Sequence, residues 1–225
     1  MTKIFFIRHC EAEGNTRGLL QGRSDSDISG NSAKQLDLVS LRLRNEPFDA
    51  MYSSPLKRAY KTAQAINQYH DLPIHTDERL IEIDMGEWEG KSWTSIEHLD
   101  PAMLKVWYDN PGDFQAPGGE SIRQVCRRMW DAVNDICQHH PDQTVCVVSH
   151  GCAIRSFLCR ALGKNIDQLN DIPWCDNTAV TVVEFENGKP RVTVMNDASH
   201  IPPELSVYRR ESGEGSSNII KDIAP

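Results

Sequence analysis

A short apolar run near the amino terminus, which stops at an arginine and a histidine, constrains this chain more than any other feature. Lys3–Ile7 reads KIFFI, and its length and bulk are typical of a β-strand buried on both faces, as in parallel sheets covered by helices. Arg8 and His9 follow directly. Ligands of open α/β sheets bind at the carboxyl ends of strands, so this position favours a functional site. A single histidine there is still more often an ordinary polar residue.

Two later stretches repeat this arrangement. Thr144–Ser149 predicts a second buried strand, and His150 follows it directly. Asp49–Ser53 predicts a third strand that leads into SSPLKR, where Arg58 lies in the first turn of a predicted helix. Because parallel strands end at one edge of the sheet, we expect both histidines and the arginine to meet there. Such a group suits a phosphate monoester, which needs cationic donors for its oxygens and a nitrogen that can attack phosphorus.

Four segments carry a resemblance to a known family. In chain order they read IRHCEAEGN, SSPLKRAYKTA, RLIEIDMGEWEG and VVSHGCAIR. Together they resemble the motifs of the histidine phosphatase superfamily (phosphoglycerate mutase-like), in its phosphatase branch, over roughly residues 3 to 200. The resemblance implies a three-layer α/β/α fold with a mostly parallel central sheet and a small helical insertion over the site. We expect one domain over residues 1–210, with the insertion at about 92–119 and a mobile tail at 211–225.

The third segment offers several candidates for an acid catalyst. Its carboxylates are Glu78, Glu82, Asp84, Glu87 and Glu89, and their spacing alone does not select one. The resemblance implies that Glu82 is the proton donor. It further implies that His9 attacks phosphorus to form a phosphohistidine, and that Arg8, Arg58 and His150 hold the phosphoryl oxygens. The expected reaction needs no metal and ends in hydrolysis of a small phosphate monoester.

The charge around the predicted nucleophile affects its protonation. Two nearby arginines, Arg8 and Arg58, should favour the neutral imidazole of His9, because a like charge disfavours protonation. We therefore expect the nucleophile to be available near neutral pH.

A polar loop over residues 14–30 is expected to wrap the substrate, because long loops in compact domains tend to be functional. The predicted substrate-binding residues of this loop and of the segment after His150 are Asn15, Gln21, Gly22, Arg17, Arg23, Gly151 and Cys152. The resemblance implies that Asn15, Gln21 and Gly22 contact the phosphate or the rest of the substrate. The two loop arginines either reach the same anion or are solvated surface charges, and both interpretations stay open.

One position departs from the family pattern, since Cys10 stands where a glycine usually follows the nucleophilic histidine. This leaves open an inactive, phosphate-binding relic. The pair His9-Cys10 followed by Arg17 also resembles the H-C-x5-R loop of cysteine phosphatases, but the spacing is wrong by one residue, and Glu11 and Glu13 would repel a phosphate. A further expectation is a redox-sensitive thiol at Cys10, because neighbouring cations lower thiol pKa values.

The choice between a phosphatase and a mutase rests on the residues after the predicted proton donor. Dedicated mutases of the family have Arg-His-Tyr-Gly there, whereas this chain has Ile83–Gly86, which reads IDMG. The departure favours a phosphatase. Phosphoglycerate mutase remains the alternative, and only a mutase would use 2,3-bisphosphoglycerate as a cofactor. The sequence does not identify the phosphate ester.

Composition limits the partners. The chain has 225 residues and a net charge of −8, which argues against nucleic acid or an anionic membrane. Seven cysteines without C-x-x-C pairs indicate reduced thiols in a cytoplasm. After Met1-Thr2-Lys3, only four apolar residues precede Arg8, too few for a signal peptide. We expect a cytoplasmic protein whose partner is a small phosphorylated metabolite, with a homodimer left open.

Periodicity predicts the remaining elements. We expect helices over 32–45, 54–70, 122–137 and 152–162, a short strand over 74–77, and a strand pair over 178–195 that turns at Asn187-Gly188. Ser54 is the expected N-cap of the second helix, and Ser121 with Gln124 forms a capping box for the third. The large side chains of the insertion, which shape specificity or form a minor core, are Trp93, Met103, Trp107 and Tyr108.

Overall fold

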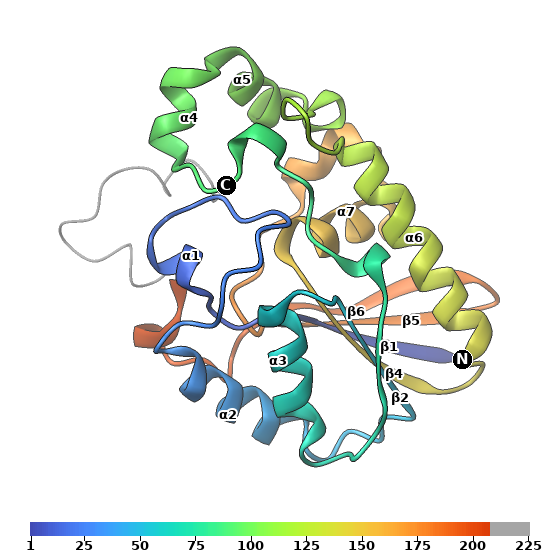
Figure 1. Ribbon diagram of the computed structural model, residues 1–225. Coiled ribbons are helices and arrows are strands. Elements are labelled where there is room, and N and C mark those ends of the chain that lie inside the picture. The colour runs from blue at the N-terminus through green and yellow to red at the C-terminus, as the bar shows by residue number, and fades with distance from the viewer. Residues whose placement is uncertain (208–225) are drawn as a thin grey trace.

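The computed structural model describes residues 1–207, so the predicted tail at 211–225 lies outside the described residues. Six strands form one sheet in the order β3-β2-β4-β1-β5-β6 (Figure 1). They are β1 (Thr2–Arg8), β2 (Ala50–Ser53), β3 (Ile74–Thr76), β4 (Thr144–Ser149), β5 (Val180–Glu186) and β6 (Lys189–Asp197). The first four in chain order are mutually parallel, and β5 and β6 are antiparallel to their neighbours. The predicted mostly parallel sheet is confirmed.

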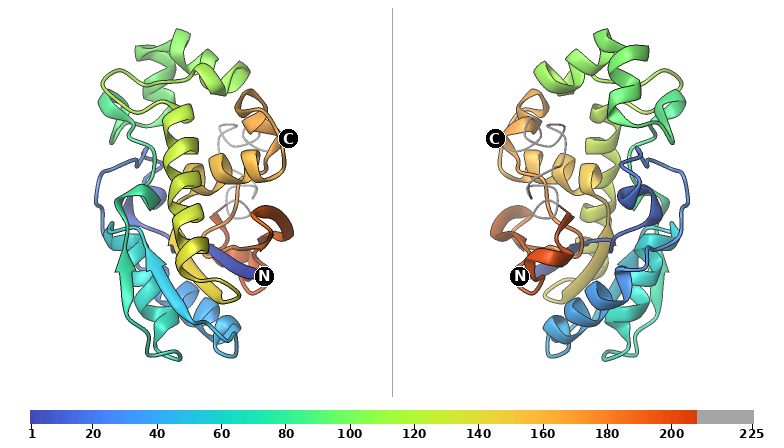
Figure 2. Two further views of the ribbon diagram at one scale, coloured as in Figure 1. Left: turned by 90° about the vertical axis from the view of Figure 1, so that its right-hand side faces the viewer. Right: turned by 90° about the vertical axis from the view of Figure 1, so that its left-hand side faces the viewer.

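Side chains that alternate along β1 explain why its apolar run is continuous. Ile4 and Phe6 belong to a core beneath α6 (Ile122–His139) and α7 (Gly151–Ala161). Phe5 and Ile7 belong to a second core with residues of α2 (Ser32–Leu43) and α3 (Lys57–Asn67). The central strand β1 is therefore buried on both faces, and the sheet lies between two helical layers (Figure 2). This confirms the predicted three-layer α/β/α fold.

Local sequence signals define some of the helix ends. Ser121 and Gln124 form the predicted capping box at the start of α6. Gly163, with φ +72°, follows α7 closely, as a helix-stopping glycine does. The prediction of Ser54 as an N-cap is wrong, because α3 begins at Lys57 and its N-cap residue is the extended Leu56. The Ser54 hydroxyl lies instead beside His150.

The predicted strand pair is confirmed as a hairpin. β5 and β6 pair antiparallel, with Glu186 opposite Lys189. Asn187 (φ +52°) and Gly188 (φ +73°) form the turn, and positive φ at both positions is what an Asn-Gly hairpin turn requires.

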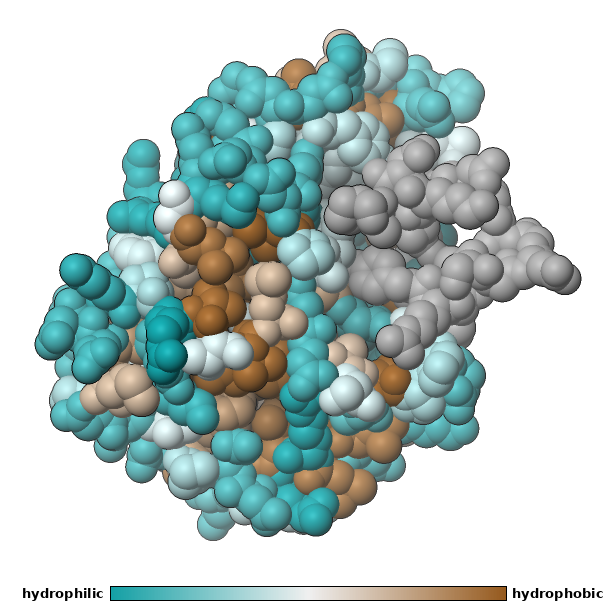
Figure 3. Space-filling view, turned by 180° about the vertical axis from the view of Figure 1, so that it is seen from behind, coloured by the Kyte–Doolittle hydropathy of each residue, from teal (hydrophilic) through white to brown (hydrophobic). Residues whose placement is uncertain are grey.

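Seen from behind, the molecule carries a strip of apolar side chains bordered by hydrophilic ones (Figure 3).

The predicted insertion contains α4 (Trp93–Leu99), α5 (Pro101–Asp109) and a 3-10 helix η3 (Pro111–Asp113), which project beyond the sheet at the top of Figure 1. Trp107 is 6 % exposed and packs edge-on against Phe114 at 4.7 Å between ring centroids. Trp93 lies 5.6 Å from the Trp107 ring. These contacts favour the interpretation of both tryptophans as a small core of the insertion.

Several short helices complete the described chain: α1 (Glu13–Thr16), η1 (Glu78–Leu80), η2 (Gly86–Trp88), η4 (Ile166–Asp171) and η5 (Pro203–Leu205). Over residues 1–207, none of the helices combines the length and the apolar character that crossing a membrane requires.

Candidate active site

The pairing of β1 with β4 brings the two predicted histidines together. Arg8, the last residue of β1, lies opposite Ser149, the last residue of β4, so the next residue of each strand is a histidine at the same edge of the sheet. The rings of His9 and His150 have centroids 5.0 Å apart. The backbone N–H of His9 donates to the carbonyl of Ser149 at 2.9 Å. The register of β1 against β4 therefore fixes the positions of His9 and His150 relative to each other.

The ring of His9 is oriented by its own neighbour in sequence. Its Nδ1 lies 2.6 Å from the carbonyl oxygen of Cys10. A carbonyl only accepts, so Nδ1 carries the proton and the lone pair is on Nε2, the nitrogen a nucleophile needs. Burial lowers the pKa of His9 well below its ordinary value, and Arg58 and Arg8 lower it further. The imidazole is neutral, as predicted, although burial contributes more than the arginines.

His150 is completely buried, and its Nε2 lies 2.8 Å from the hydroxyl oxygen of Ser54. That oxygen also accepts the N–H of Leu56 at 3.3 Å, and we assign the hydroxyl proton to a hydrogen bond with Nε2. The ring proton then resides on Nδ1, which is buried and has no hydrogen-bond partner among residues 1–207. Burial, followed by the charge of Arg58, lowers the pKa of His150.

Arg58 is buried, and its exposed fraction is 0 %. Its two terminal nitrogens donate to the carbonyls of Gly22 and Ser24 at 2.8 and 2.7 Å. Its Nε, like Nδ1 of His150, is buried without a partner in the described part of the chain. Two buried donors without acceptors are typical of a site that binds an anion. Arg8 donates to the carbonyl of Cys175.

The carboxylate of Glu82 sits at the amino-terminal end of α7. It accepts the backbone N–H groups of Cys152 and Ala153, each at 3.0 Å, and that of Ile83 at 2.9 Å. The N–H groups at the start of α7 have no partner within the helix, so they are available to hold the carboxyl group there. Since α7 begins directly after His150, these contacts place Glu82 beside the histidine pair.

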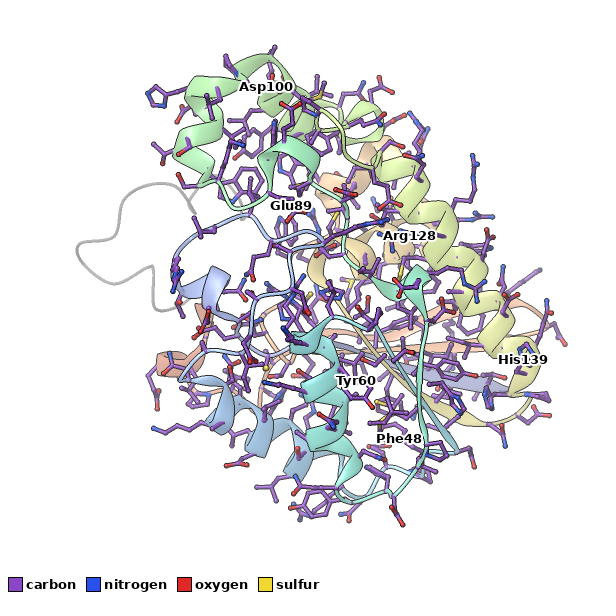
Figure 4. All side chains as sticks on the ribbon, in the orientation of Figure 1. Phe48, Tyr60, Glu89, Asp100, Arg128 and His139 are labelled. Carbon is purple, nitrogen blue, oxygen red and sulfur yellow. The ribbon has the colours of Figure 1, made fainter. Side chains whose placement is uncertain are left out.

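The side chain of Glu89 packs closely against the backbone of Gly22. The carboxylate of Glu89 accepts four backbone N–H groups, which are those of Gly22, Arg23, Ser24 and Met85. A Cβ atom at Gly22 would lie 2.1 Å from a Glu89 oxygen, so no larger residue fits there. Glu89, labelled in Figure 4, thus ties the loop over residues 14–30 to the segment that carries Glu82.

The other predicted binding residues make these contacts. Asn15 accepts the N–H of Ala12 at 3.0 Å, and Gln21 accepts the hydroxyl of Ser26. Arg23 pairs with Asp84 at 3.4 Å, and Arg17 is exposed. A Cβ at Gly151 would lie 3.2 Å from the Trp174 ring and 3.5 Å from Arg8 Nε, so Gly151 lies within the site. Cys152 contributes its backbone to Glu82.

Cys10 is buried against α3. Its side chain is fully buried, its backbone N–H donates to Thr62 Oγ1 at 3.0 Å, and its thiol lies 3.9 Å from the carbonyl of Arg58. Its φ is not in the left-handed region that favours glycine. Burial raises the pKa of the Cys10 thiol, which argues against the expected lowering by neighbouring cations and so against a reactive thiol. The same burial argues against a cysteine nucleophile.

Sequence reasoning missed the segment that covers the backbone of the predicted nucleophile. Asn177 donates from Nδ2 to the carbonyl of His9 at 2.9 Å. Thr178 donates its N–H to the carbonyl of Arg8 at 3.1 Å and has φ +58°, which is strained for a β-branched residue. A polar Asp-Asn-Thr run between elements gives no signal of such contacts.

Two histidines and two arginines at the carboxyl edge of a mostly parallel sheet, with a carboxylate beside them, define the class of phosphoryl-transfer enzymes that use a histidine nucleophile. A family model described as "Histidine phosphatase superfamily (branch 1)" matches residues 4–198. The chain belongs to this family and is a histidine-type phosphatase.

Relatives agree with this assignment. Phosphoserine phosphatase 1 of Hydrogenobacter thermophilus is 33% identical over 204 residues, covering 89% of this chain and 95% of that protein. The "Metal-independent phosphoserine phosphatase" of Arabidopsis thaliana is 31% identical over 204 residues, covering 89% and 84%. The "Probable phosphoglycerate mutase GpmB" of Proteus mirabilis is 31% identical over 163 residues, covering 72% and 76%.

Within residues 1–207, no group of three or more His, Cys, Asp or Glu side chains could hold a metal ion.

Solved structures share the fold. YhfR of Bacillus stearothermophilus has a TM-score of 0.86 and 31% identity, and the match covers 90% of this chain and 100% of that one. A mutant phosphoserine phosphatase of Entamoeba histolytica in complex with phosphoserine has a TM-score of 0.80 and 29% identity, with the same coverage.

Proposed function

We propose that the site hydrolyses a small phosphate monoester in two steps, with His9 as the nucleophile and Glu82 as the acid and base. The observation that carries this proposal is the arrangement around His9. Its neutral ring has the lone pair on Nε2 and lies 5.0 Å from the ring of His150, with the guanidinium groups of Arg8 and Arg58 nearby.

In the first step, Nε2 of His9 attacks phosphorus, and the bond from phosphorus to the alcohol oxygen breaks. Protonated Glu82 gives its proton to that oxygen as the alcohol leaves. Arg8, Arg58 and His150 donate to the phosphoryl oxygens. In the second step, Glu82 takes a proton from water, whose oxygen attacks phosphorus, so that inorganic phosphate leaves and His9 is restored.

The substrate we propose to test first is phosphoserine, because it is the substrate named for several of the relatives. The loop and helix-start residues proposed to contact it are Asn15, Arg17, Gln21, Gly22, Arg23, Gly151 and Cys152. We propose that hydrolysis requires no metal, in line with the relative described as metal-independent.

A mutase remains the second candidate, because one relative is named a probable phosphoglycerate mutase. Both reactions share the first step and differ in the acceptor of the phosphoryl group. The IDMG sequence of Ile83–Gly86 favours water as the acceptor. Assays of phosphoserine and 3-phosphoglycerate, with and without 2,3-bisphosphoglycerate, distinguish the two: a mutase would interconvert phosphoglycerates and would depend on that cofactor.

The proposed nucleophile is tested by His9→Ala. We expect the variant to lose turnover of p-nitrophenyl phosphate and to lose the acid-labile, base-stable phosphoenzyme that the wild type forms. Phosphoenzyme that persists in the variant would overturn the scheme. A wild type without any phosphatase activity would instead support the inactive relic.

Three further expectations stay predictions. A chain truncated after residue 210 should fold as the single domain, cell fractionation should find the protein in the cytoplasm, and its molar mass in solution decides whether it is a homodimer.

A further inference from the structure

The segment that carries Glu82 has no regular secondary structure of its own. Residues 81–85 lie between η1 and η2 and form no strand of the sheet. A carboxyl group that transfers a proton must nevertheless be held within a fraction of an ångström of its target. The side-chain contacts of Glu82 with α7 fix one end of the residue. Its backbone needs another support.

Arg128, on α6, supplies that support. Its guanidinium donates to three backbone carbonyls in and just before the segment: those of Arg79 at 2.8 Å, Ile81 at 2.5 Å and Glu82 itself at 3.1 Å. Arg128 therefore holds the backbone on both sides of the Cα atom of the proposed proton donor. Arg128 and Glu89 approach this segment from two sides (Figure 4).

Glu120 fixes the guanidinium in turn. Its two carboxylate oxygens accept from Nε and a terminal nitrogen of Arg128 at 2.7 and 2.9 Å, in a two-point ion pair whose side chains are 11% and 14% exposed. The backbone N–H of Glu120 also donates to the carbonyl of Asp84 at 2.9 Å. Such a planar, two-point contact restricts the arginine far more than a lysine could be restricted.

We infer that Arg128, locked by Glu120, is a positioning residue that aims the carboxyl group of Glu82 at the leaving oxygen of the substrate. This inference rests on the proposed function, in which Glu82 protonates that oxygen. Arg128 itself touches neither the phosphate nor the alcohol. Its charge lies close enough to the site to contribute to the lowered pKa of His150.

A positioning role and a merely structural role differ in their dependence on the leaving group. The nitrophenolate of p-nitrophenyl phosphate leaves without a proton, whereas the alkoxide of an alkyl phosphate needs one. Misplacing Glu82 should therefore slow hydrolysis of alkyl phosphates selectively. A loss of folded protein or of phosphate binding would slow both substrates alike.

The experiment compares Arg128→Met with Arg127→Met in the full chain. Arg127 is the exposed neighbour on the same helix and outside these contacts, so its replacement removes the same charge. For Arg128→Met we expect kcat on β-glycerophosphate to fall by about tenfold more than kcat on p-nitrophenyl phosphate, a fraction of the full effect of a general acid. Arg127→Met should leave both rates unchanged, and Arg128→Lys should restore little.

Parallel losses on both substrates for Arg128→Met would overturn the inference. If that variant does not fold, Glu120→Gln, which breaks only the ion pair, must show the same selective loss, and its absence would overturn the inference as well. Glu82→Gln is the reference. A selective loss for Glu82→Gln alone defeats only the role of Arg128, whereas no selectivity for Glu82→Gln removes Glu82 from the proposed function.

Discussion

Arg58 and Glu89 hold the same loop from opposite sides. The guanidinium of Arg58 donates to the carbonyls of Gly22 and Ser24, and the carboxylate of Glu89 accepts the N–H groups of Gly22, Arg23 and Ser24. The carbonyls of this backbone are thereby paired with the buried Arg58, and its N–H groups with the partly buried Glu89. The positions of the loop and of Arg58 are consequently coupled, because moving the loop also moves Arg58.

The first prediction concerns Glu89→Gln. In glutamine, an NH2 group that only donates replaces one of the two carboxylate oxygens. The N–H groups bonded to that oxygen therefore lose their acceptor. We expect a loss of about 2 kcal/mol in the free energy of unfolding and a higher KM, because the loop no longer holds Arg58. Urea unfolding and steady-state kinetics measure both. The control is Glu87→Gln at an exposed position on the same segment, and an equal effect there would contradict the explanation.

The second prediction is a loss of stability in mild acid. The pKa values of His9 and His150 are lowered in the folded state, and that of His200 is lowered to about 4, mainly by burial. Below an ordinary pKa of about 6.5 the unfolded chain binds protons that the folded chain does not, so stability falls as pH falls. We expect the urea midpoint to decrease between pH 7 and pH 5.

Replacing His200 by Gln should make that decrease smaller, because one of the histidines with a lowered pKa no longer takes up a proton on unfolding. The exposed His98→Gln is the matched control and should leave the pH dependence as it is. A wild-type midpoint that rises toward pH 5 would contradict the lowered pKa values.

The third prediction tests the ring proton of His150. In Ser54→Ala, Nε2 loses the hydroxyl at 2.8 Å, so the tautomer with a proton on Nδ1 is no longer enforced. We expect inorganic phosphate to bind about tenfold more weakly, as loss of one charge-assisted hydrogen bond would produce. Calorimetry measures the affinity. Ser53→Ala is the control, because the Ser53 hydroxyl donates to a backbone carbonyl and not to the histidine; equal weakening there would argue against the tautomer.

Features that depend on strands could be predicted from the sequence. A strand buried on both faces has a continuous apolar run, as in Lys3–Ile7, so the first polar residue after it marks the sheet edge. The same logic located His150, and the paired ends of β1 and β4 then placed both histidines together. The choice of Glu82 among five carboxylates needed the family resemblance, because only the fold brings α7 to that residue.

Features that depend on packing between distant elements could not be predicted. Arg127 and Arg128 are identical neighbours in the sequence. Only the orientation of α6 about its axis exposes Arg127 and lets Arg128 donate to three backbone carbonyls. Ser54-Pro55 matches a helix start equally well whether or not a histidine lies beside the hydroxyl. Whether Cys10 is reactive depends on Thr62 and the backbone of Arg58, which are 48 or more residues away.

The last prediction restores the family's usual glycine with Cys10→Gly. Because Cys10 has no left-handed φ to relieve, glycine gains nothing there and removes a fully buried side chain. We expect unchanged turnover and a loss of about 1 to 2 kcal/mol in the free energy of unfolding, from greater freedom of the unfolded chain and a small cavity. Peroxide should inactivate wild type and variant at the same rate, since burial raises the thiol's pKa. Faster inactivation of the wild type, reversed by added thiol, would mean that Cys10 is accessible after all.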